Sequence, residues 1–162
     1  MNRSIDPKEK LELILKDLNE NTKFLENKNF IQHGTTTVYD HVISVSLRSI
    51  EIAEKYNLDV DYDSLIRGAL LHDYFLYDWH DKDNRPHLHG IFHPRLALIN
   101  AKKELLLNEI EEDIIKKHMF PLTPIPPKYI ESWIVVMADK TVATRESVGF
   151  MFKNKANVGA NI

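Results

Sequence analysis

The chain has 162 residues and a formal net charge of −3, which is the size of one ordinary domain. So mild an acidity gives no field to hold a nucleic-acid backbone, and no apolar run is long enough to cross a bilayer. Because the chain has no cysteine, disulfides, thiolate metal ligands and a cysteine nucleophile are excluded. The first residues, MNRSIDPKEK, lack the apolar stretch of a secretory signal. We therefore expect a soluble, cytoplasmic protein without nucleic-acid or membrane partners.

Helical periodicity dominates the first half of the chain. Asp6 and Pro7 form a typical helix start, since aspartate caps and proline suits the first helical position. A second helix is predicted from the threonines at 35–37 to about Tyr56, and a third leads into His72. The core face expected for the second helix consists of Val38, Val42, Val45, Ile52 and Ala53.

The second half of the chain begins with a polar segment, 78–90, whose lack of any period predicts an irregular loop. Helices are predicted over about 91–107, 109–119 and, after a run of prolines, 128–145. Residues 153–162 are predicted to be a weakly ordered tail. The sequence thus predicts one all-α domain over 1–162, a bundle of about six helices with its core at about 32–146.

Several histidines and aspartates stand out against apolar surroundings. His72 and Asp73 follow the apolar run Gly68–Leu71, His41 interrupts an apolar helix face, and Asp139 ends an apolar helical stretch. A buried carboxylate is costly unless a cation accompanies it. Imidazole and carboxylate together suit Zn, Fe or Mn, and such ligands commonly come from different helices of a bundle. The pattern predicts a metal site.

In this order the residues resemble the HD superfamily of metal-dependent phosphohydrolases. Its signature is a helix-borne His (His41), then a His-Asp pair (His72 and Asp73), then a distant Asp on a late helix (Asp139). The dinuclear branch adds two histidines, and the resemblance assigns these positions to His93, followed by Pro94, and His118. The segment 138–140, Ala-Asp-Lys, also resembles the family. The resemblance covers about 32–146 and implies an HD-like helical fold.

The resemblance implies a dinuclear centre of divalent ions, with Fe, Mn and Zn as the candidates. One ion would be held by His41, His72, Asp73 and Asp139, and the other by Asp73, His93 and His118. Asp73 would bridge the two ions, and a bridging water acidified to hydroxide would attack phosphorus. The substrate implied is a nucleotide or another small phosphorylated metabolite, cleaved as a phosphomonoester or phosphodiester.

Two cations are candidates for phosphate contact beside the bridging Asp73. Lys140 follows the predicted ligand Asp139 directly, and Arg95 lies two residues after His93. Either residue could equally be an ordinary surface cation. We include both with Asp73 in the predicted catalytic set.

The chain also departs from the best-known branches of the family. Leu76 stands where many dinuclear members have a phosphate-binding lysine, and the Gly-Ile-Pro of cyclic dinucleotide phosphodiesterases is absent. Two alternatives stay open: an HD-type diiron oxygenase, which uses the same ligands, and a non-catalytic nucleotide-sensing module. The oligomeric state, including a homo-oligomer, is open too.

Four further histidines have no assigned role. His80, His87 and His89 lie in the polar loop, where a solvated surface is the expected position, and His33 precedes the His41 helix closely enough to reach the pocket. Both ends of the 78–90 loop are tethered to predicted ligands. We therefore expect this loop to border the mouth of the site, as a lid would.

Overall fold

The computed structural model describes residues 5–83 and 85–159. These residues form α-helices, one short 3-10 helix (η1) and a small two-stranded sheet, so the prediction of an all-α helical bundle is confirmed. In chain order the elements are α1 (Pro7–Asn21), η1 (Phe24–Asn29), β1 (Ile31–His33), β2 (Thr36–Thr37), α2 (Val38–Lys55), α3 (Tyr62–Leu71), α4 (His89–Glu104), α5 (Glu109–Lys117) and α6 (Ile130–Gly159). Within the described residues no helix is both long and apolar enough to span a membrane.

The helices begin where local capping chemistry predicts. The Asp6 carboxylate accepts the N–H of Lys8 at 2.9 Å, with proline at the first helical position of α1. The Thr37 hydroxyl accepts the N–H of Asp40 at the start of α2. Such side chains pair backbone donors that a helix start otherwise leaves unsatisfied. The predicted starts of the first two helices are therefore confirmed.

Helix α2 occupies the centre of the bundle, with α3 and α6 packed against it, and α5 packs on α3, α4 and α6. The predicted apolar face of α2 is buried, with Val42 and Val45 fully enclosed. At Gly68 the side chain of Ile114 approaches so closely that a Cβ would collide with it. This close approach brings the C-terminal ends of α3 and α5 together, which matters because both ends carry histidines.

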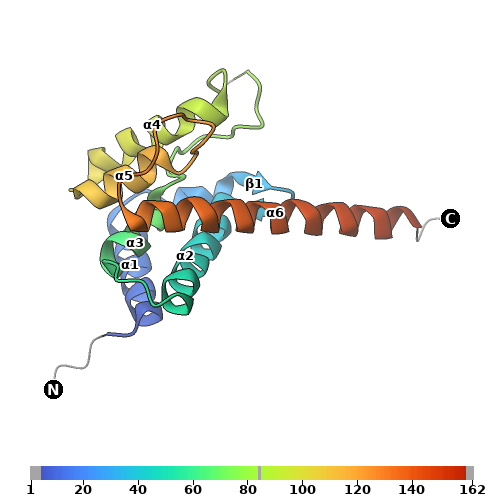
Figure 1. The fold of residues 1–162 in the computed structure, drawn as a ribbon. Helices are drawn as coiled ribbons and strands as arrows, with labels where there is room; N and C mark the ends of the chain where they lie inside the picture. Colours follow the sequence, from blue (N-terminus) through green and yellow to red (C-terminus); the bar gives the residue numbers. More distant parts are fainter. Residues whose placement is uncertain (1–4, 84, 160–162) are drawn as a thin grey trace.

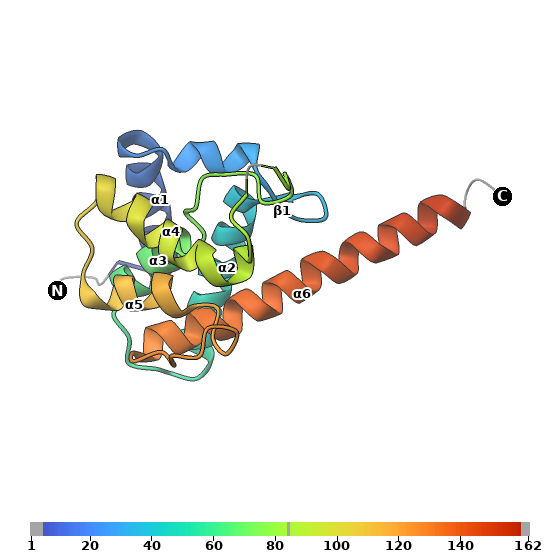
Figure 2. The same cartoon turned by 90° about the horizontal axis from the view of Figure 1, so that it is seen from above.

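Two features differ from the predicted elements. The segment before α2 forms the hairpin β1–β2, whose turn includes Gly34 in the left-handed region at φ 60°. Helix α6 continues to Gly159 instead of ending near Arg145, and its C-terminal half projects from the body of the bundle (Figures 1 and 2). The side chain of Phe150 in α6 packs on Gly34 of the hairpin. This contact stabilises α6 next to Gly149, a residue that lowers helix stability. The helix takes in most of the predicted tail, and residues 160–162 lie outside the described residues.

Candidate metal centre

The structure brings the six predicted ligands together from five elements. Each side chain lies at or near a helix end except the last, which is in the middle of α6, and none is more than 9% exposed. In chain order the six are His41 in α2, His72 and Asp73 at the end of α3, His93 in α4, His118 at the end of α5 and Asp139 in α6. Side chains from so many elements meet here because helix ends converge at this face of the bundle.

The first group of donors lies between α2, α3 and α6. The Nε2 atom of His41 is 3.0 Å from Oδ1 of Asp139 and 3.8 Å from Oδ2 of Asp73. The Nε2 atom of His72 is 3.5 Å from Oδ2 of Asp73 and 3.7 Å from Oδ1 of Asp139. Two imidazole nitrogens and two carboxylates thus face one common centre.

The second group lies on the other oxygen of Asp73. Its Oδ1 is 3.1 Å from Nε2 of His93 and 3.4 Å from Nε2 of His118. Because Oδ2 faces the first group and Oδ1 the second, this single carboxylate stands between them. That is the arrangement which a bridging ligand requires.

Each histidine is oriented by a hydrogen bond at its other ring nitrogen. The Nδ1 atoms of His72, His93 and His118 lie 2.6, 2.9 and 2.9 Å from backbone carbonyls one turn earlier, and each can only donate there. His41 makes the equivalent bond, 2.9 Å long, to the Glu146 carboxylate. With the Nδ1 hydrogen committed, Nε2 is the nitrogen left to bind a proton or a metal.

The close approach of the ring nitrogens is stable only when a proton or a metal ion lies between them. Nε2 of His93 and Nε2 of His118 are only 2.8 Å apart, and two lone pairs at that distance repel unless a cation or proton lies between them. Nε2 of His72 is buried without a hydrogen-bond partner, a costly state for a polar atom. An imidazole–carboxylate donor set of this kind fits Fe, Mn or Zn.

The pKa values of His41 and Asp73 also show that positive charge is favoured at this site. Burial lowers the pKa of His41, but its hydrogen bonds to Asp139 and Glu146 outweigh burial and raise the pKa to about 10. Burial acts to raise the pKa of Asp73, yet the neighbouring His72, His118 and His93 hold it well below its usual range. Protons on imidazole balance the carboxylates in the absence of metal, and a metal ion competes with those protons.

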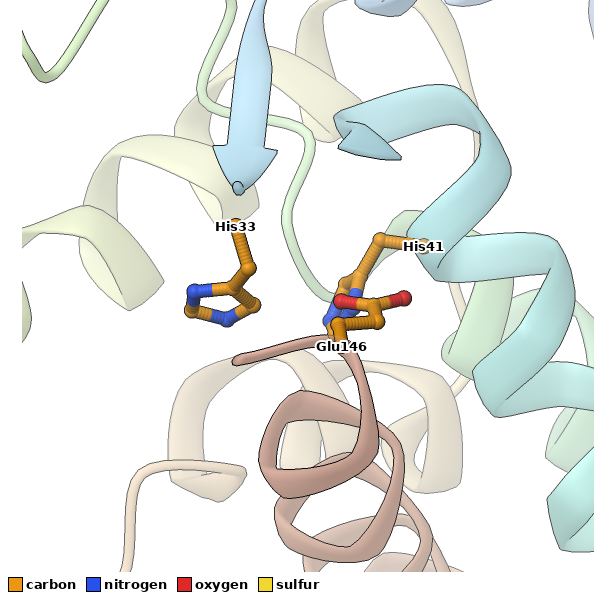
Figure 3. A group of neighbouring side chains, drawn as sticks. All are labelled: His33, His41 and Glu146. Carbon is orange, nitrogen blue, oxygen red and sulfur yellow. The ribbon is translucent and has the colours of Figure 1, made fainter. Parts of the chain in front are cut away.

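Two residues to which the sequence analysis gave no role, His33 and Glu146, lie against His41 of the first group. Figure 3 shows His33 at the end of β1, with His41 and Glu146 beside it; the rings of His33 and His41 are 5.5 Å apart. These three side chains offer a further set of donor atoms within 4.8 Å of one another. A usable signal existed for Glu146, because it follows Asp139 by seven residues and so shares its helix face.

Gln32 is a third residue at the site to which the sequence analysis gave no role. It is buried in β1 and donates its amide N–H to Oδ2 of Asp73 at 2.6 Å. This bond holds the same carboxylate oxygen that faces His41 and His72. The hairpin therefore positions the residue on which both donor groups depend, a role that its short, aperiodic sequence did not reveal.

A cavity of about 930 Å³ opens beside the two groups. Lys140, a predicted phosphate contact, lines it, whereas Arg95 lies on the exposed side of α4, outside the lining. Arg85, from the predicted loop, lines the cavity instead. Arg95 is therefore misplaced for the predicted contact, because α4 turns His93 inward and carries the residue two positions later to a different face.

The loop between α3 and α4 borders the cavity, as predicted, through Trp79 and Leu88. His80 and His87 are exposed, but His89 is not a solvated surface residue. His89 is the first residue of α4, lines the cavity and stacks on Trp79. Its Nδ1 atom lies 2.7 Å from the Tyr77 hydroxyl, within hydrogen-bond distance. Burial, with the nearby charge of His93, lowers the pKa of His89 to about 4.

Comparison with known families agrees with the geometry. The sequence model of the HD domain family matches residues 38–144, which include all six converging side chains. The chain therefore belongs to the HD domain family, a superfamily of metal-dependent phosphohydrolases. No curated protein and no solved structure gives a significant match.

Proposed function

We propose that the protein is a dinuclear metal-dependent phosphohydrolase. The observation that carries the proposal is the orientation of the four histidines, each held by a hydrogen bond at Nδ1 so that Nε2 faces the two oxygens of Asp73 or its neighbours. One ion would be held by His41, His72, Asp73 and Asp139, and the other by Asp73, His93 and His118. The ions are of the Fe, Mn or Zn type.

In the proposed reaction a phosphoester and water give an alcohol and a phosphate, with the proton of water ending on the leaving oxygen. A pair of divalent ions supplies, when bound, a water acidified toward neutrality and a Lewis acid for the phosphate oxygens. Asp73, whose two oxygens face the two donor groups, would be a ligand of both ions. Lys140 and Arg85 line the cavity beside them and stabilise the charge that develops on phosphate oxygens.

The proposed substrate is a small phosphorylated metabolite, with nucleotides as one candidate class. The proposal carries over the predictions that the protein is cytoplasmic and acts without nucleic-acid or membrane partners. The cavity is of a size that suits small molecules.

The test is metal analysis of the purified protein together with hydrolysis of p-nitrophenyl phosphate and bis(p-nitrophenyl) phosphate. Mn²⁺ or Fe²⁺ is expected to restore activity after chelation, and His72→Ala is expected to remove it. His87→Ala is the matched control, because His87 is exposed and outside the cavity lining. A fully metal-loaded protein inert toward all phosphoesters would overturn the proposal, and oxygen uptake with a phosphonate would support the oxygenase alternative.

A further inference from the structure

The lining of the cavity beside the metal centre combines two kinds of side chain. The predicted ligands, together with Lys140 and Arg85, supply charge and polar atoms. Five residues supply apolar surface, and we define them together as the aliphatic wall: Leu88, Met119, Pro121, Leu122 and Ala143. A ligand that fills the cavity therefore meets both charge and apolar surface.

Two loops far apart in the sequence build this wall. Leu88 belongs to the loop between α3 and α4, whereas Met119 and Leu122 follow α5; both loops lie above α6 in the view of Figure 1. Gly90, the second residue of α4 and two residues after Leu88, lies close to Leu122: an added Cβ would be 3.1 Å from its Cδ2. The segment that carries Leu88 and the segment that carries Leu122 therefore adjoin one another beside the cavity.

The wall is not explained by packing of the core. Leu88 is 68% exposed and Leu122 is 55% exposed. Leu88 also adopts the left-handed conformation, with φ 58° and ψ 50°, and caps α4 without any side-chain hydrogen bond. Glycine or asparagine is the usual residue in such a position. An exposed leucine held there, at the mouth of a charged cavity, points to an apolar ligand.

The wall is poorly suited to a nucleobase or a free sugar. Its aliphatic side chains offer no hydrogen bonds, so polar edges buried against them would lose their partners in water. The one indole in the lining, Trp79, already stacks on His89 at 5.0 Å and lies 3.9 Å from the ring of His80. Its ring faces are therefore engaged within the protein, and stacking of a base has less surface to use.

We infer that the substrate is an amphiphilic phosphoester: a phosphate whose alcohol part is a hydrocarbon chain that lies along Leu88, Met119 and Leu122. This inference rests on the proposed function, because it places the phosphate at the metal centre. The charged end meets the ions, Lys140 and Arg85, and the hydrocarbon displaces water from the aliphatic wall.

The test uses metal-loaded protein and soluble alkyl phosphates from propyl to octyl, below their micelle concentrations. Each methylene buried on the wall is expected to raise kcat/KM about three- to fourfold until the wall is covered. A nucleoside monophosphate and a hexose phosphate serve as polar competitors. A flat series, or a nucleotide cleaved better than octyl phosphate, would overturn the inference.

Variants locate the effect on the wall. In Leu122→Asp, the increase in kcat/KM from propyl to octyl phosphate is expected to be about tenfold smaller than in the wild type, because a charged side chain replaces apolar surface on the wall. Leu106→Asp is the matched control, since Leu106 is 94% exposed and lies outside the cavity lining. Equal flattening in both variants, or in neither, would contradict the assignment.

The same ligands separate failure of the inference from failure of the proposed function. If small aryl phosphoesters are cleaved but chain length has no effect, the phosphohydrolase stands and the amphiphilic substrate is wrong. If no phosphoester is cleaved, calorimetric binding of propyl- and octylphosphonate to the metal-loaded protein decides the question. Tighter binding of the octyl compound supports the apolar occupant, and equal binding overturns it.

Discussion

Two buried aspartates, Asp113 in α5 and Asp73 at the end of α3, obtain their positive partners in different ways. Asp113 is complete by itself: Lys117 lies 2.6 Å from Oδ1, and Oδ2 accepts hydrogen bonds from the Ser132 hydroxyl at 2.7 Å and the backbone N–H of Lys128 at 2.8 Å. These partners join α5 to the segment that begins α6. The carboxylate is a structural link, with its charge balanced inside the protein.

Asp73 has one ordinary donor, the amide of Gln32. Its other neighbours are the Nε2 atoms of four histidines. The Nδ1 hydrogens of these histidines are used in hydrogen bonds to other groups. Here charge balance must come from protons on the rings or from bound ions. The comparison teaches that burial of a charge does not identify a functional site, whereas a shortage of permanent partners around that charge does.

The largest expected effect separates the two aspartates by metal content. Asp73→Ala is expected to reduce bound metal below one ion per chain and to lower phosphoester hydrolysis by about a thousandfold, about 4 kcal/mol. Plasma emission spectroscopy and initial rates measure the two quantities. Asp113→Ala, the matched substitution, should leave both unchanged. An Asp73→Ala protein that keeps two ions would show that this carboxylate does not bridge them.

Stability is expected to show the reverse order. Asp113→Ala leaves the Lys117 ammonium, the Ser132 hydroxyl and the Lys128 backbone N–H without their acceptor, so the free energy of unfolding should fall by about 3 kcal/mol. Urea denaturation of the metal-free proteins measures the loss. Asp59→Ala, at an exposed aspartate, is the control and should change stability by less than about 0.5 kcal/mol. A loss of similar size in both variants would contradict the special role of Asp113.

A smaller effect is expected at Glu146, which contacts the predicted ligand His41. Glu146 orients His41 through the 2.9 Å bond to Nδ1, and loss of such a partner costs about 10- to 100-fold in metal affinity. Glu146→Gln keeps a hydrogen-bond acceptor but loses the negative charge. The dissociation constant of the variant for Mn²⁺ should therefore increase by about tenfold, the smaller limit of that range. Ser147→Ala, at the exposed neighbour, is the control. Unchanged affinity in Glu146→Gln would restrict the residue to a packing role.

The smallest effect concerns pH. Burial acts to raise the pKa of Asp113, but the Lys117 ion pair and the Ser132 hydrogen bond outweigh it and lower the pKa below its ordinary value. The stability that Asp113 contributes is therefore present above the unfolded-state pKa of about 3.9 and is lost as the pH falls through the folded value. The difference in unfolding free energy between the wild type and Asp113→Asn should be constant above about pH 5 and shrink below pH 4. A difference that grows on acidification would contradict the assignment.

Comparison of the two aspartates also shows how far the sequence could lead. The apolar surroundings of His41 and Asp139 made their burial predictable, and the order of the histidines and aspartates indicated the family. Asp113 carried only the i,i+4 spacing to Lys117, which is also common on solvated helix faces. Its other partners, the Ser132 hydroxyl and the Lys128 backbone N–H, come from a later part of the chain that no local pattern connects to it. Nothing in the sequence indicated that Arg85 lines the cavity and Arg95 does not, since an irregular loop has no period that predicts where its side chains point.

By itself, the sequence determined the helical class, most helix starts and the identity of the six converging side chains. These follow from local capping chemistry, from periodicity and from residue types that recur in one family order. Only the tertiary structure decided that Asp73 stands between two donor groups, that the β1–β2 hairpin supplies Gln32 and His33, and that α6 extends to Gly159. The physical reason is distance along the chain: His41 and Asp139 are 98 residues apart, and their meeting depends on the packing of α2 against α6, which no local pattern encodes.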